Sequence, residues 1–286
     1  MLRRLVYRRL PSFAVAGAAI AVACAVGCAS SVQPSVPTGG QADVPENYPM
    51  TIVESAEHRD SMTALWQRLF ETYGVPADRR KVPDLQPFTH TPQSILGIGP
   101  ISLAGSGGAP VDDERVRQLV RDFIGKNAEL LGVNAADLSL DNVMESGKLG
   151  KRFTFVQTSY SYPIVRPAGV IELMVTPAGD LIQLTDTAIP VADLPSQATV
   201  TAAQAESRVI GTTFTYGDIA GRPQSVIVSD PKAVSAKRLV VYADVGESAL
   251  RIWLAWEVEA GTSLSWTVYV DAVTGKIVSQ RQNFQT

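Results

Sequence analysis

The sequence is poor in the side chains that build reactive centres. Its 286 residues include two cysteines, Cys24 and Cys28, and two histidines, His58 and His90. No His-Glu-x-x-His motif occurs, so the zinc-binding pair of histidines of a thermolysin-type peptidase is missing. No histidine stands in a context that suggests a Ser-His-Asp arrangement. We therefore expect that the protein is not an enzyme and that it has no metal site and no cofactor.

Basic residues are too few for a nucleic-acid partner. The chain has 25 Lys and Arg against 28 Asp and Glu. Four of the arginines precede Cys28, where no other charge occurs, so cleavage there leaves 21 basic and 28 acidic side chains, a net charge of −7. Phosphate binding needs clustered Lys and Arg. This balance predicts no nucleic-acid partner and no polybasic contact with a membrane.

The first 28 residues read as a leader. Arg3, Arg4, Arg8 and Arg9 form a basic start, and an apolar run over 13–26 follows. Basic, apolar and small residues in that order indicate a secretory signal peptide, and the run is shorter than the ~20 residues of a membrane span. Ala25-Val26-Gly27-Cys28 resembles the lipobox of bacterial lipoproteins, which implies cleavage after residue 27 and acylation of Cys28. The alternative is ordinary secretion, with Cys28 as a bystander thiol.

Residues 28–50 have the composition of a flexible tether. They are rich in Ser, Pro, Gly and Gln, and such a stretch cannot build a core. With an acylated Cys28, the tether predicts a protein held by lipid on the extracytoplasmic side of the cell envelope, on the periplasmic face or the outer membrane if the cell is Gram-negative.

The remaining chain predicts an α+β fold of consecutive modules. Residues 51–109 begin with a helix over 56–73 and continue as an extended, Pro-rich segment with a short strand near 93–98. The next two segments, 110–190 and 196–286, each begin with a helix and continue as an antiparallel sheet. The cap of the first helix is Asp112 or Asp113. The second helix is capped by Thr201, and the alternative is that Val200-Thr201 is its lead-in. The expected strands are 137–145, 151–160, 169–176, 181–187, 225–228, 238–243, 250–259, 264–271 and 276–282. We expect 250–259 to be central and covered on both faces.

Two stretches carry a resemblance to known modules. Trp256-Glu257-Val258 and the hairpin over 266–278, with Asp271-Ala272-Val273-Thr274-Gly275, resemble the end of a PepSY domain. The helix end over 123–132 and the strand pattern over 152–164 resemble the fungalysin/thermolysin propeptide (FTP) module, although Ser161 replaces its usual glycine and 166–169 its Gly-rich patch. The resemblance implies that 110–190 is an FTP-like and 196–286 a PepSY-like module, both cystatin-like.

In secreted thermolysin-like peptidases these modules form the pro-region, which assists folding of the catalytic domain and inhibits it. The resemblance therefore implies a non-catalytic binding protein, a stand-alone inhibitor or folding chaperone of a secreted metallopeptidase. We expect a sheet edge to pair with the partner, and the tail over 282–286 to reach toward it. The alternative is a structural or scaffolding lipoprotein with no peptidase partner. A third reading, a small-ligand sensor, requires an apolar pocket lined by tryptophans.

Few side chains are candidates for a site. We expect His58 and His90 to be solvated polar residues. The acidic run Asp112-Asp113-Glu114 is expected to complement the dipole of a helix start, with a cation site as the alternative. Gly97-Ile98-Gly99 lacks the glycine spacing of a phosphate loop. We expect Trp253, Trp256 and Trp266 to fill the space between helix and sheet, with a stacking surface for sugar or peptide as the alternative.

Overall fold

The computed structural model describes residues 44–285, except 95–99 and 106–110. Residues 41–286 form one compact unit. The unit contains helices and antiparallel sheets, so the predicted α+β class is confirmed. The signal peptide, Cys28 and most of the tether lie outside the described residues. Among the residues described, no helix combines the length and apolarity that a membrane span requires.

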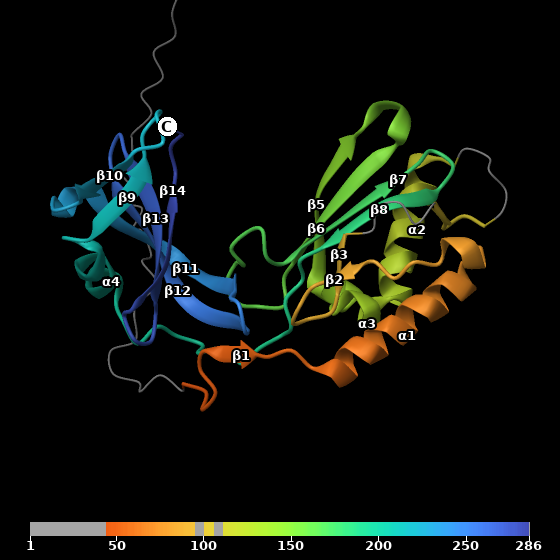
Figure 1. Ribbon diagram of the computed structural model, residues 1–286, viewed down its shortest axis with the longest axis horizontal. Helices are drawn as coiled ribbons and strands as arrows, with labels where there is room; N and C mark the ends of the chain where they lie inside the picture. The colour runs from red at the N-terminus through yellow and green to blue at the C-terminus, as the bar shows by residue number, and fades with distance from the viewer. Residues whose placement is uncertain (1–43, 95–99, 106–110, 286) are drawn as a thin grey trace, which may run out of the picture. The chain divides into compact units, whose positions relative to one another are not determined.

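The first sheet has five antiparallel strands (Figure 1). Their spatial order is β4 (Ile101–Ser102), β8 (Asp180–Asp186), β7 (Val170–Val175), β6 (Lys151–Gln157) and β5 (Leu138–Glu145). Helix α2 (Asp113–Lys126) begins at Asp112, whose Oδ1 accepts the Arg115 N–H at 2.8 Å. The short helix α3 (Ala128–Leu131) ends at Gly132, whose φ of 65° is easily reached only by glycine. The expected helix and strands of this module are therefore present.

The helix α1 (Ala56–Thr72) packs into the core of this first module. Ser55 caps its start and Gly74 follows its end, and the helix agrees with the one expected over 56–73. Its Trp66 and Phe70 are fully buried in one cluster with Phe123 of α2 and Phe153 of β6. The strands β2 (Asp84–Leu85) and β3 (Pro92–Ser94) pair with each other beyond it. Residues 56–94 thus contribute directly to the module that follows them.

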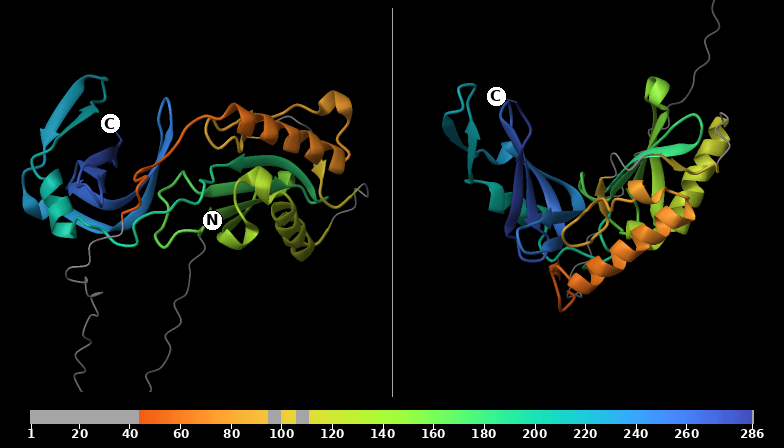
Figure 2. Two further views of the ribbon diagram at one scale, coloured as in Figure 1. Left: turned by 90° about the horizontal axis from the view of Figure 1, so that it is seen from below. Right: turned by 45° about the vertical axis from the view of Figure 1, so that its right-hand side comes forward.

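The second sheet also has five strands, and one helix covers one of its faces (Figures 1 and 2). The strands are β1 (Met50–Ile52), β11 (Val234–Val245), β12 (Leu250–Gly261), β13 (Ser265–Asp271) and β14 (Ile277–Gln282). Helix α4 (Ala202–Val209) begins with a reciprocal capping box between Thr201 and Gln204. Its Ala205 and Val209 pack against Val258 and Trp266. Thr201 is therefore the cap and Val200 the lead-in.

Strand β1 joins the second sheet from a distant part of the chain. It pairs with the start of β12, from Met50 opposite Ile252 to Ile52 opposite Leu250, on the side where β13 pairs further along. Just before it, the Tyr48 hydroxyl lies 2.6 Å from Asp271 Oδ1 and 3.1 Å from the Leu254 carbonyl oxygen. The structure differs here from the expected tether, because residues 48–50 are bound to the sheet.

Several strands differ in extent from the prediction. Strand β9 (Thr213–Gly217) was not expected, and it forms with β10 (Pro223–Ile227) a separate two-stranded ribbon, teal in Figure 2. Strand β6 ends at Gln157 rather than at residue 160. Strand β12 is central, but Arg251 and Glu259 are exposed on one face, so its expected double cover is wrong. The described residues also contain the short 3₁₀ helices η1 (Ala77–Arg79), η2 (Ala135–Asp137), η3 (Gly147–Leu149) and η4 (Pro231–Ala233).

Candidate functional site

The face of the second sheet opposite α4 carries a row of polar side chains. Side chains on directly paired residues of an antiparallel sheet share a face. Arg238 of β11 pairs with Glu257 of β12, Glu257 with Tyr269 of β13, and Tyr269 with Ser279 of β14. The pairing therefore places these four residues in one row across four strands.

A loop of the first module lies along the outer edge of β11. The loop connects β6 to β7, and its Val165 N–H donates to the Val241 carbonyl oxygen at 2.9 Å. The Val241 N–H donates to the Pro163 carbonyl oxygen, also at 2.9 Å, and Ile164 forms a parallel bridge with Val241. Val165 packs against the buried cluster of Val240, Ala255 and Tyr269. The loop therefore covers part of the edge and stands beside the row.

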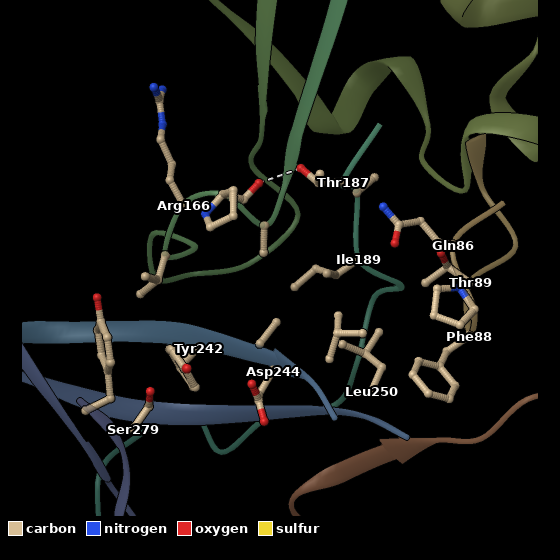
Figure 3. A pocket seen from close by; sticks show the side chains of 18 of the residues that line it. Gln86, Phe88, Thr89, Arg166, Thr187, Ile189, Tyr242, Asp244, Leu250 and Ser279 are labelled. Atoms are coloured by element: carbon tan, nitrogen blue, oxygen red, sulfur yellow. Dashed lines mark hydrogen bonds between the residues drawn. The ribbon is translucent and has the colours of Figure 1, made fainter. Parts of the chain in front are cut away.

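Two cavities flank this loop. The first, of about 580 Å³, lies between the segments 86–89, 165–168 and 187–189 and the strands β11 and β14 (Figure 3). The second, of about 510 Å³, lies between 156–170 and the polar row. Both volumes are typical of ligand sites in proteins. The cavities share five lining residues: Val165, Arg166, Ala168, Tyr269 and Arg281. We call the two cavities together the loop groove.

The lining of the first cavity contains a stacked pair of tyrosines, of which Tyr269 also lines the second cavity. The rings of Tyr242 and Tyr269 lie 4.5 Å apart at 23°. Burial raises the pKa of both phenols, and for Tyr242 a hydrogen bond to Ser279 opposes the rise. Tyr269 is 2% exposed and its hydroxyl has no hydrogen-bond partner among the described residues. Leaving such a group unpaired costs about 1–3 kcal/mol.

Most of the charges of the loop groove are neutralised by neighbours. Arg238 Nε lies 2.7 Å from Glu257 Oε2, and Arg166 Nη2 lies 2.6 Å from Asp141 Oδ2. The Arg166 side chain points away from the first cavity in Figure 3. Arg281 is exposed and forms no ion pair within the described part of the chain. The groove therefore combines a mostly apolar first cavity with a more polar second one, and Arg281, which lines both, is an exposed cation.

The two histidines of the chain contact each other outside this groove. Their ring centroids are 5.3 Å apart, His58 Nε2 lies 2.9 Å from the Thr89 oxygen, and His90 Nε2 lies 3.1 Å from the Ser55 oxygen. The expectation of a solvated His90 is wrong, because it is 2% exposed. Burial and, to a smaller extent, the charge of His58 lower the pKa of His90. The pair joins the start of α1 to the segment before β3.

The acidic run at the start of α2 has structural partners. Asp112 caps the helix, and Asp113 forms an ion pair with Lys151 of β6. No group of three or more His, Cys, Asp or Glu capable of holding a metal ion occurs within residues 44–285 as described. The Asp112 cap and the Asp113–Lys151 ion pair are consistent with the expected role of the acidic run at the helix start. Gly97-Ile98-Gly99 lies outside the described residues.

The tryptophans do not line the loop groove. Trp266 is buried under α4 and stacks on Phe214 at 4.7 Å, and Trp256 Nε1 donates to the Val200 oxygen at 2.7 Å. Trp253 is half-buried and lies 6.0 Å from Tyr242. Neither cavity of the groove contains a tryptophan among its lining residues, so the tryptophan-lined pocket required by the sensor reading is not found there.

The C-terminal tail folds back on its own module. The Phe284 ring packs edge-on against Trp266 at 5.1 Å and against Tyr216 at 5.4 Å. The Asn283 N–H donates to the Ser265 oxygen at 3.0 Å. The expectation that the tail reaches toward a partner is therefore wrong for residues 282–285.

Sequence reasoning did not identify the residues of the loop groove. Tyr242, Tyr269 and Arg281 occupy ordinary alternating strand positions, and only strand pairing places them together. One signal is present in the sequence: 166–169 depart from the FTP pattern, and Arg166 and Ala168 of this stretch line both cavities.

Comparisons with known proteins were made by family, by sequence and by structure. No family model matches the chain, and no curated protein matches it. Four chains of solved structures match. One is the Bacillus megaterium YpeB C-terminal domain, with 11% sequence identity and a TM-score of 0.32, over 82% of this chain and 100% of that chain. A TM-score of that size carries no argument about the fold or the function of this chain.

Proposed function

We propose that this protein is a non-catalytic binding protein that holds a segment of a partner protein in the loop groove. The observation that carries the proposal is the groove itself, whose first cavity has mostly apolar walls with a few polar groups among them. Such a combination is typical of sites that bind a ligand rather than of the packed interior of a domain. The acylated Cys28 of the sequence-based prediction would keep the protein on the extracytoplasmic side of a membrane.

The partner that we propose is a secreted metallopeptidase, which the protein would inhibit or help to fold. The resemblance of 110–190 and 196–286 to propeptide modules supports this choice. A pro-region supplied as a separate chain loses the high effective concentration of a covalent one. A shared membrane surface would restore part of it, which is consistent with a lipid-anchored protein.

The proposal is tested with a groove-filling variant of the full-length protein in detergent. Ala168→Trp puts a large ring into the loop groove, and Ser225→Trp puts the same ring on the exposed face of β10 as the control. A thermolysin-type metallopeptidase is assayed for residual activity and refolding yield in the presence of each protein. We expect wild type and Ser225→Trp to change one of these values to the same extent at the same concentration. Ala168→Trp should need at least about tenfold more protein for that effect, which corresponds to a loss of about 1.4 kcal/mol of binding free energy.

Two outcomes would contradict the proposal. If no envelope metallopeptidase responds to the wild-type protein, the inhibitor and chaperone roles are wrong and the scaffolding alternative is favoured. If Ala168→Trp acts as well as wild type and remains folded by circular dichroism, the groove is not the site.

A further inference from the structure

We infer that the loop groove holds its partner segment as an extended strand, paired through its main chain with the open edge of β11 at Ala243 and Val245. This inference rests on the proposed function, because it names how the same groove binds and what it selects. The occupant is an extended stretch of the partner protein with an apolar side chain at every second position.

The outer edge of β11 is open next to the place where the loop covers it. The N–H and the carbonyl oxygen of Val241 both bond to the loop, so the main chain of Val241 faces away from β12. The pairing of β11 with β12 is regular from Arg238 to Val245, so this orientation recurs at every second residue, at Ala243 and at Val245. Within the described part of the chain, no hydrogen bond joins the main chain of either residue to a neighbour on this side. Two N–H groups and two carbonyl oxygens therefore remain available.

A strand edge of this kind is a template for an added strand. Unpaired N–H and C=O groups in a row pair with the main chain of another extended segment. The loop shows that this edge accepts such a segment, because Pro163 and Val165 bond to Val241 and Ile164 forms the bridge. A partner segment of about four residues, at ~3.3 Å per residue, is long enough to continue the pairing past the two open residues.

The first cavity of the groove provides room for this strand. Ala243 and Val245 line the cavity, whose volume is about 580 Å³ (Figure 3). Ala243 packs against a buried cluster that includes Phe88, Ile189 and Leu250, and these three residues line the same cavity. Side chains on directly paired residues share a face of a sheet. A residue opposite Ala243 on the added strand would therefore lie toward this apolar cluster, which selects an apolar side chain there.

The edges of β5 and β10 lack such a cavity. Both are edge strands of their sheets, but none of their residues lines either cavity of the loop groove. A strand added there would pair its main chain outside the groove. Only a strand beside β11 uses the open edge and the apolar cluster together, so we place the partner segment there.

The test uses three uncharged peptides and the full-length protein in detergent. Acetyl-Thr-Val-Thr-Val-Thr-amide has an apolar residue at every second position. The second peptide has the same side chains, but each of its backbone nitrogens is methylated, so it cannot donate to β11. The third, acetyl-Thr-Ser-Thr-Ser-Thr-amide, keeps the main chain and lacks the apolar side chains. Isothermal titration calorimetry measures binding, and amide hydrogen exchange over 242–245 is measured with and without the valine peptide.

Two proline variants test the same contact from the side of the protein. Val245→Pro removes an N–H that faces away from β12, and edge strands tolerate proline at such positions. Ser225→Pro is the matched control, because Pro223, two residues earlier in β10, already has proline in the same orientation. Ser225 is exposed and lines neither cavity. Circular dichroism shows whether both variants are folded.

We expect the valine peptide to bind wild type at least about tenfold more tightly than either of the other peptides, and to slow exchange over 242–245. Val245→Pro should weaken this binding about tenfold, and Ser225→Pro should leave it unchanged. The inference is overturned if the valine peptide does not bind, if the methylated or the serine peptide binds as tightly, or if exchange over 242–245 is unchanged. A folded Val245→Pro that binds as wild type does would also overturn it. If Val245→Pro does not fold, the peptide comparison and the exchange measurement on wild type decide.

Failure of this inference is distinguishable from failure of the proposed function. A peptidase that responds equally to wild type and Val245→Pro, but not to Ala168→Trp, would show that the groove holds its partner without strand pairing. If the valine peptide pairs with the edge and no metallopeptidase responds, the inference stands, and the inhibitor and chaperone roles are wrong.

Discussion

Single buried polar residues determine how this protein responds to pH. Asp186, at the end of β8, is 0% exposed. Its Oδ1 accepts the Ala188 N–H at 2.7 Å, but its Oδ2 has no partner among the described residues. Burial raises the pKa of this carboxyl well above its usual value, because the charged form loses its hydration. The folded protein therefore binds a proton at Asp186 more strongly than the unfolded chain does.

This difference in pKa between the folded and unfolded states predicts that ionisation of Asp186 lowers the free energy of unfolding as the pH rises. The carboxyl contributes its full stability below the unfolded-state pKa of about 4, and the contribution is lost as the pH rises toward the folded-state pKa. Asp186→Asn removes the titration, so we expect the variant to lose less free energy of unfolding than wild type between pH 5 and pH 8. Urea unfolding of the full-length proteins at both pH values measures the change.

Asp218 provides a control, because its pKa is shifted in the opposite direction. It is a carboxylate of the β9–β10 turn, and its pKa is lowered by hydrogen bonds from the backbone and side chain of Arg222. Its contribution is present above pH 4 and is lost on acidification. Asp218→Asn should therefore leave the change between pH 5 and pH 8 as it is in wild type. An Asp186→Asn variant with the pH dependence of wild type would show that Asp186 ionises normally in the folded state.

At the scale of elements, turns with glycine set where strands begin. Gly147 is the first residue of η3, between β5 and β6, and Gly150 directly follows η3; both have positive φ, at 59° and 114°. A Cβ on Gly147 would meet no atom within 4 Å, whereas a Cβ on Gly150 would lie 2.0 Å from the Val175 oxygen. The two positions thus share the backbone requirement and differ in the space available.

The pair predicts two different costs for the same substitution. Gly147→Ala should lower the free energy of unfolding by about 1–2 kcal/mol, the cost of a left-handed backbone for an L-residue. Gly150→Ala should lower it by about 1–3 kcal/mol more, because the methyl group displaces the backbone of β7. Urea unfolding measures both. Equal costs would show that β7 moves away freely at this point.

At the scale of the whole molecule, the segment after the tether belongs to both halves of the fold. Strand β1 lies in the second sheet, and four residues later α1 enters the core of the first module. Tyr48 attaches the start of this segment to Asp271, which also accepts the N–H of Val273 and the hydroxyl of Thr274. The hairpin that resembles PepSY therefore anchors the N-terminal part of the described chain.

Loss of the Tyr48 hydroxyl should loosen this attachment. We expect Tyr48→Phe to lower the free energy of unfolding by about 1.5–3 kcal/mol, the range for hydrogen bonds to charged groups. It should also speed amide hydrogen exchange over 50–52. Tyr162→Phe removes a hydroxyl that donates to the Ser196 oxygen at 2.8 Å, and as a neutral, exposed bond it should cost about 0.5–1.5 kcal/mol. A cost at Tyr48 no larger than at Tyr162 would mean that β1 holds the segment without the carboxylate.

Helix caps, turns and most strands could be predicted from the amino-acid sequence. The helix starts at Asp112 and Thr201, the turn before β6 and the hairpin at 273–275 were predictable, because caps and turns depend on residues a few positions apart. The alternation of apolar residues also predicted most strands and the α+β class. Strand β9 (Thr213–Gly217) was not predicted, although its Thr-Phe-Thr-Tyr run has residue types that favour a strand.

The contacts between residues far apart in the sequence became known only from the tertiary structure. The position of β1 beside β12, the burial of His90 and the return of Phe284 to Trp266 all depend on contacts between residues far apart in sequence or in different elements. The loop groove depends on them most, since Tyr269, Arg281 and the 163–168 loop share a site only through strand register and a parallel bridge at Val241. Strand periodicity specifies the side of the sheet on which a residue lies, but it does not specify which strand is its neighbour.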